Sequence, residues 1–122
     1  MNVLIVDDSD LLRGRLASML EVDRVHVVGQ AEDGLQAILA IQLLAPDAVI
    51  LDLRLPGVSG FVVLRAIKRL QPAPLVVVLT SYPTQQYRTR CLEAGADWFF
   101  DKATEFAKVI EVLQPLARRD GV

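Results

Sequence analysis

The sequence contains one cysteine, one histidine and no long run of apolar residues. A single cysteine cannot form an internal disulfide, and Cys91 has no companion ligands for a zinc site. The apolar runs are far shorter than a membrane-spanning helix, and no signal peptide is recognisable. These absences exclude a disulfide-stabilised secreted domain and a membrane protein, so we expect a cytoplasmic protein.

An excess of positive charge is also missing. The net charge is −2, and Arg118 and Arg119 alone make no basic stripe, so direct nucleic-acid binding is not expected. The 122 residues are 52% apolar and 23% charged, which is typical of one soluble globular domain. We predict that this domain covers residues 1–118 and that residues 119–122 form a short tail.

Apolar runs typical of strands alternate with amphipathic stretches typical of helices. In the second helical stretch, Leu35, Ile38, Leu39 and Leu43 are spaced for one buried face, and Pro115 is predicted to bend or end the last helix. The predicted strands cover residues 3–6, 25–31, 48–51, 75–79 and 98–100. The predicted helices cover residues 9–20, 33–44, 60–70, 84–94 and a final segment that begins at 104.

Five strand–helix repeats predict an α/β protein in which helices cover both faces of a parallel sheet. A flavodoxin-like, doubly wound sheet of five strands and five helices, with strand order 2-1-3-4-5, fits this pattern best. The second strand contains the only histidine, His26, and is therefore predicted to lie at an edge.

The pair Asp7-Asp8 directly follows the first apolar strand. Two adjacent carboxylates at a strand end cost free energy unless a cation joins them, which favours a metal site. The alternative is that Asp8 or Ser9 only caps the following helix. The pair by itself leaves both interpretations open.

Polar residues also follow the other central strands. In an open α/β sheet, Asp52, Thr80 and Lys102 meet Asp7 and Asp8 in the crevice at the carboxyl ends of the strands. The three carboxylates form an oxygen-rich, negative pocket that suits Mg²⁺. Asp52 can attack a phosphoryl donor, Lys102 supplies a positive charge and Thr80 a hydroxyl group. This combination favours phosphoryl chemistry.

Four motifs in this order resemble the receiver domains of two-component response regulators. The resemblance extends from Asn2 to about Ala117. The motifs are Leu4-Ile5-Val6-Asp7-Asp8, the segment from Val49 to Gly57, Val78-Leu79-Thr80-Ser81, and Gly95-Ala96-Asp97 leading to Lys102.

The resemblance implies that Asp52 accepts a phosphoryl group from the phosphohistidine of a sensor histidine kinase or a histidine phosphotransfer protein. Asp8, Asp52 and the backbone carbonyl of Arg54 would ligate Mg²⁺, and Asp7 would act mainly through a metal-bound water. Lys102 would pair with the phosphoryl group.

The resemblance also implies a conformational switch. Thr80 would move toward the phosphoryl group and Phe99 would turn inward, changing the face formed by the fourth helix, fifth strand and fifth helix. That face would control a partner protein or an output domain. The chain would be no turnover enzyme, with slow self-dephosphorylation at most.

Some positions depart from the common pattern or vary within it. Ala103 stands where many members have proline, and Phe99 where tyrosine is common. Arg54 and Tyr82 flank the site, and we hypothesise that they tune the access of water. Homodimerisation through the last two helices is compatible with the sequence, although no specific feature supports it.

Three other functions are less consistent with these residues. A haloacid-dehalogenase-type Mg²⁺ phosphatase would need an aspartate where Arg54 stands. A nucleotide- or flavin-binding domain would need a glycine- or hydroxyl-rich loop after the first strand. A degenerate receiver that acts only as a protein-interaction scaffold would not need all the key positions intact.

Overall fold

The computed structural model describes residues 1–21 and 25–120, and within them five parallel strands form one sheet in the order β2-β1-β3-β4-β5. The predicted fold class and strand order are therefore confirmed. The strands are β1 (Asn2–Val6), β2 (His26–Ala31), β3 (Ala48–Leu51), β4 (Leu75–Thr80) and β5 (Trp98–Asp101). The helices are α1 (Asp10–Leu20), α2 (Gly34–Leu44), α3 (Gly60–Lys68), α4 (Gln85–Glu93) and α5 (Lys108–Asp120).

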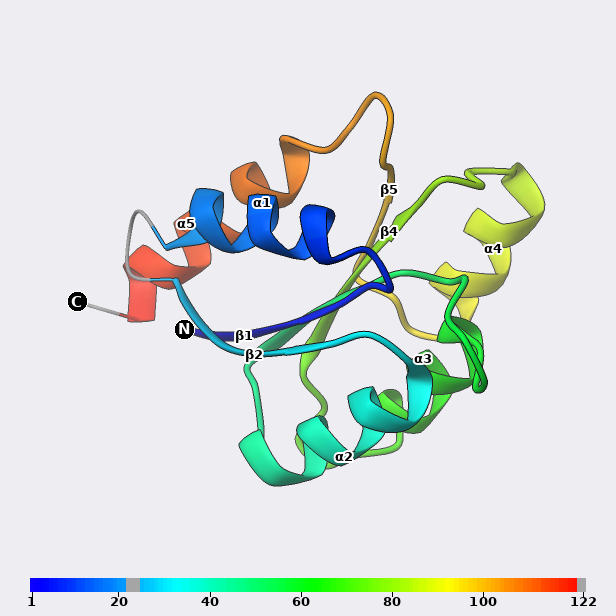
Figure 1. Cartoon of the computed structure of the whole chain (residues 1–122), viewed down its shortest axis with the longest axis horizontal. Helices are drawn as coiled ribbons and strands as arrows, with labels where there is room; N and C mark the ends of the chain where they lie inside the picture. Colours follow the sequence, from blue (N-terminus) through cyan, green and yellow to red (C-terminus); the bar gives the residue numbers. More distant parts are fainter. Residues whose placement is uncertain (22–24, 121–122) are drawn as a thin grey trace.

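Helices cover both faces of the sheet, with α1 and α5 on one side and α2 and α3 on the other (Figure 1). Successive strand residues point to opposite faces, so each central strand contributes to two hydrophobic clusters. In β1, Leu4 and Val6 pack with α2, α3 and α4, whereas Val3 and Ile5 pack with α1 and α5. Burial on both faces explains why β1, β3 and β4 are almost continuously apolar.

The edge position of β2 is confirmed, and His26 is exposed there. No helix among the described residues has both the length and the apolar character needed to cross a membrane.

The predicted buried face of α2 is wrong. Leu35, Leu39 and Leu43 are 62%, 56% and 84% exposed, and the buried residues of this helix are Gly34, Ala37 and Ile41. The cause is close packing, because a Cβ added to Gly34 would lie only 2.2 Å from the backbone oxygen of Val58. The inner face therefore needs glycine at position 34, Ile38 is partly buried as expected, and the three leucines face outward.

The last helix begins later than predicted and continues through Pro115. Asp101 accepts a hydrogen bond from the backbone N–H of Ala103 at 2.8 Å, and Glu105 accepts one from the N–H of Asp101 at 3.2 Å. These local bonds compete with helix formation, so α5 begins at Lys108. It extends to Asp120 because Leu113 and Ala117, on either side of Pro115, are buried in the core. Residues 121 and 122 lie outside the described residues, so the tail boundary after residue 118 stays a prediction.

Candidate functional site

The loops that follow β1, β3 and β5 bring four charged side chains together at the carboxyl edge of the sheet. Carboxylate oxygens of Asp7, Asp8 and Asp52 all lie within 4.8 Å of one another. The Nζ of Lys102 lies 2.6 Å from Oδ2 of Asp7 and 3.1 Å from Oδ2 of Asp52. The backbone N–H of Asp52 donates to the carbonyl of Val6 at 3.0 Å, which extends the pairing of β1 and β3 up to the site.

The two adjacent aspartates have different surroundings. Asp7 is buried, its Oδ1 accepts the backbone N–H of Ser9 at 2.9 Å, and its Oδ2 pairs with Lys102. Asp8 is exposed and accepts no hydrogen bond from any residue in the described part of the chain. The cap of α1 is Ser9, whose hydroxyl accepts the N–H of Leu12 at 3.2 Å. Helix capping therefore accounts for Ser9 but leaves the carboxylate of Asp8 available for another role.

The buried environment shifts the pKa of both Asp52 and Lys102. Burial raises the pKa of Asp52, the charge of Lys102 opposes this rise, and the charge of Asp7 adds to it. Burial alone would lower the pKa of Lys102, but its hydrogen bond to Asp7 and the charges of both aspartates outweigh that effect and raise it. Lys102 is therefore held as an ammonium group.

The donor set fits a hard divalent cation. Only carboxylate oxygens converge here, which suits Mg²⁺ better than zinc or copper. With all groups ionised, three carboxylates and one ammonium leave two negative charges, which a dication would neutralise. Both oxygens of Asp7 have partners in the protein, whereas the carboxylate of Asp8 has none in the described part of the chain, so Asp8 is the better placed of the adjacent pair as a direct ligand. The metal role predicted for the Arg54 carbonyl stays a prediction.

Thr80 and Phe99 lie on the paired strands β4 and β5. Thr80 is fully buried at the end of β4, and its hydroxyl accepts the backbone N–H of Tyr82 at 3.0 Å. Phe99 is 4% exposed and lies in the hydrophobic cluster on the α3 and α4 side of the sheet. The guanidinium of Arg88, on α4, donates to the backbone oxygen of Phe99 at 3.2 Å. The ring is thus inward in this structure, and the predicted switch motion stays untested.

Arg13 is the site residue that sequence reasoning missed. Its nearly buried guanidinium donates to the backbone oxygen of Asp7 at 2.6 Å, to Oε1 of Gln30 at 3.2 Å and to the carboxylate of Asp10. The available signal was its helical spacing, because Arg13 falls on the same face of α1 as the buried Leu16 and Leu20.

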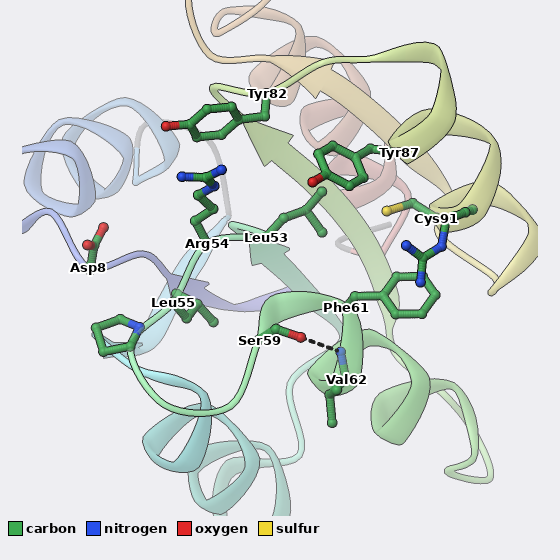
Figure 2. A pocket seen from close by; sticks show the side chains of 12 residues that line it. Asp8, Leu53, Arg54, Leu55, Ser59, Phe61, Val62, Tyr82, Tyr87 and Cys91 are labelled. Atoms are coloured by element: carbon green, nitrogen blue, oxygen red, sulfur yellow. Dashed lines mark hydrogen bonds between the residues drawn. The ribbon is translucent and has the colours of Figure 1, made fainter.

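Arg54 and Tyr82, which flank the site in the sequence, contact each other in the structure. The guanidinium carbon of Arg54 lies 3.7 Å from the centre of the Tyr82 ring, which is a close cation–π contact. This stack lies at one end of a cavity that Asp8 also lines (Figure 2).

Comparisons with known proteins identify the family to which the sequence is similar. The model of the response regulator receiver domain family matches residues 3–114. The response regulator GacA of Pseudomonas viridiflava is 34% identical over 115 residues, which are 93% of this chain and 54% of that protein. The chain thus spans about half the length of the curated relatives it matches.

Solved structures show the same fold. The signal receiver domain of a putative response regulator NarL from Mycobacterium tuberculosis is 27% identical with a TM-score of 0.86, covering 96% of this chain and 95% of that one. A chain of the CheX-CheY-BeF3-Mg²⁺ complex from Borrelia burgdorferi is 27% identical with a TM-score of 0.87, and the match covers 95% of this chain and 88% of that one.

Proposed function

The chain belongs to the response regulator receiver domain family, and from this premise we propose that it is a switch operated by phosphorylation of Asp52. The environment of the Asp52 side chain is the main support for this proposal. A buried carboxylate stands at the end of a central strand, contacts the ammonium of Lys102 and lies beside two further carboxylates.

In the proposed reaction, a carboxylate oxygen of Asp52 attacks the phosphorus of a phosphohistidine on a sensor kinase or phosphotransfer protein. A P–O bond forms, the P–N bond breaks, and the imidazole nitrogen keeps the electron pair. Asp8, Asp52 and the backbone carbonyl of Arg54 would hold Mg²⁺, which supplies neutralisation of the phosphoryl charge when bound.

Lys102 and Thr80 would respond to the new group. The ammonium of Lys102 contacts both Asp7 and Asp52 in this structure. A phosphoryl oxygen on Asp52 would be a stronger hydrogen-bond acceptor for it than either carboxylate. The Thr80 hydroxyl accepts the N–H of Tyr82 in this structure, and it would instead donate a hydrogen bond to a phosphoryl oxygen. Because β4 pairs with β5, where Phe99 lies opposite Val78, this movement would be transmitted to the face formed by α4, β5 and α5.

The change in that face would control a downstream protein or an output domain, so the chain acts as a signalling element and not as a turnover enzyme. A cytoplasmic location and the absence of direct nucleic-acid contact by this domain are parts of the proposal. The stack of Arg54 on Tyr82 would shield the acyl phosphate from water, so Arg54→Ala should accelerate dephosphorylation. An unchanged rate in that variant would remove this role.

The test is phosphorylation of the wild type and of Asp52→Asn with acetyl phosphate and Mg²⁺. Intact-mass measurement should show one added phosphoryl group in the wild type and none in Asp52→Asn. The matched control is Asp33→Asn, which also replaces one carboxylate by an amide but keeps a side chain that caps α2. It should behave as the wild type does.

Beryllium fluoride with Mg²⁺ should also shift the NMR signals of Thr80 and Phe99 in the wild type alone. A wild type without any Mg²⁺-dependent response would refute the switch and favour the scaffold function.

A further inference from the structure

A cavity of about 700 Å³ lies between the loop after β3, helix α3 and helix α4 (Figure 2). Its walls are mainly apolar and aromatic, formed by Leu53, Leu55, Phe61, Tyr82, Tyr87 and Cys91. It meets the acidic site only at the end where Asp8 and Arg54 lie, so most of its surface has no part in the proposed phosphoryl transfer.

Two arginines line this cavity without an ion pair. The guanidinium carbon of Arg90 lies 4.5 Å from the centre of the Phe61 ring, and that of Arg54 lies 3.7 Å from the centre of the Tyr82 ring. Over residues 1–21 and 25–120, neither guanidinium forms a salt bridge, whereas Arg13 and Lys102 both do. The cavity thus combines apolar walls with two guanidinium groups, neither of which forms an ion pair with a carboxylate of the described residues.

Helix α4 leaves this space open because it packs loosely. Cys91 is its one buried residue, and Tyr87 and Arg90 both contribute to the cavity wall. Figure 2 shows the Tyr87 side chain extending from the α4 side toward Leu53, with Phe61 on the α3 side. A molecule placed there would contact α3 and α4 together.

We propose that this cavity binds a small organic anion, with an apolar or aromatic body and one carboxylate or phosphate group. The volume is in the range of pockets that hold small ligands, roughly 300–1,000 Å³. Leu55, Phe61 and Tyr87 would contact the apolar body. The anionic group would accept hydrogen bonds from Arg90, whose guanidinium carbon lies 4.5 Å from the centre of the Phe61 ring.

Arg90, and not Arg54, is assigned to the anion because of their surroundings. Arg54 lies at the end of the cavity shared with Asp8, and the acidic cluster would repel a second anion there. Arg90 is on α4, at the end of the cavity with Phe61 and Cys91.

The test is an NMR titration of the whole chain with naphthoate and with the uncharged naphthamide, which share one apolar body. Both titrations omit Mg²⁺ and any phosphodonor, so their outcome is independent of the proposed phosphorylation. We expect saturable shifts at Phe61, Tyr87 and Cys91, and binding of naphthoate about tenfold tighter than that of naphthamide.

Three variants locate the charge that is responsible. Arg90→Gln should abolish the preference for naphthoate, and Arg90→Lys should retain part of it because the charge remains without the paired donors. The control is Arg65→Gln, which removes an exposed arginine of α3 that does not line the cavity and should leave the preference unchanged. Equal affinity for both probes, no saturable shifts, or an equal loss in Arg65→Gln would each overturn the proposal.

Discussion

Replacing Lys102 by methionine should destabilise the metal-free protein by about 3–5 kcal/mol. The ammonium lies 2.6 Å from Asp7 and 3.1 Å from Asp52, and the two carboxylate side chains are only 4% and 6% exposed. With an effective dielectric constant of about 20, Coulomb's law gives about 5 to 6 kcal/mol for each attraction. Most of this is offset by the cost of removing the charges from water, which is several kcal/mol per ion. The variant loses the attraction but keeps both carboxylates buried.

The size of the loss should depend on Asp52. Lys102→Met removes the attraction between the ammonium and Asp52, whose charged atoms lie 3.1 Å apart. In an Asp52→Asn background that attraction between full charges is already absent, so Lys102→Met should cost at least about 1 kcal/mol less there. Saturating Mg²⁺ should also recover part of the loss, since a dication replaces the missing positive charge.

The assay is urea unfolding at neutral pH with a metal chelator, followed by circular dichroism and by the fluorescence of Trp98, the single tryptophan. The control is Lys108→Met, which removes a surface lysine paired with Glu105 and should be far milder, because exposed ion pairs contribute little to stability. The reasoning is refuted if Lys102→Met is as mild as this control, or if its cost is the same with and without Asp52→Asn.

The pH dependence of stability should also change in Asp52→Asn. Because burial raises the pKa of Asp52 in the folded state, the folded protein binds more protons than the unfolded one between the ordinary and the raised pKa. Stability of the metal-free wild type should therefore fall relative to Asp52→Asn as pH rises through that window, and urea unfolding over a pH series measures the difference. Gly60→Ala should cost about 1–3 kcal/mol, since its Cβ would lie 2.0 Å from the backbone oxygen of Asp52. Gly14→Ala, where nothing lies within 4 Å, should not destabilise the protein by the same assay. Leu39→Gln should change stability by less than about 0.5 kcal/mol, whereas Ile41→Ala should cost about 2–5 kcal/mol; a similar loss in both would contradict the observed face of α2.

The sheet and the convergence of the site residues were predictable for one reason. Central parallel strands are buried on both faces, so an apolar run marks each of them, and the first polar residue marks where it ends. Asp7, Asp52 and Thr80 directly follow or end such runs, and the strand order then brings them to one edge.

The buried face of α2 was not predictable from hydrophobicity. The periodicity of apolar residues selected the large leucines, but close contact with the loop before α3 requires glycine at position 34. At this contact the size of the residue, and not its hydrophobicity, determines which side of the helix can face the protein. The start of α5 was missed for another reason, since the hydrogen bonds of Asp101 and Glu105 to nearby backbone groups have no periodic signature.

The partners of Arg13 could be identified only in the fold. Its helical spacing indicated a buried position. However, Gln30 is seventeen residues away in sequence, and the acceptor on Asp7 is a backbone carbonyl, which any residue type would offer.

This guanidinium also has a dynamic consequence. Through Gln30 and the carbonyl of Asp7, Arg13 fastens the outermost strand, β2, to the loop that carries the acidic pair. Edge strands open locally more often than the centre of a sheet, and amide hydrogen exchange measures such openings. Each opening of β2 around Gln30 would break the hydrogen bond between Arg13 and Gln30 and weaken the one between Arg13 and the Asp7 carbonyl. The average order of the acidic site therefore depends on fraying at the edge of the sheet farthest from β5.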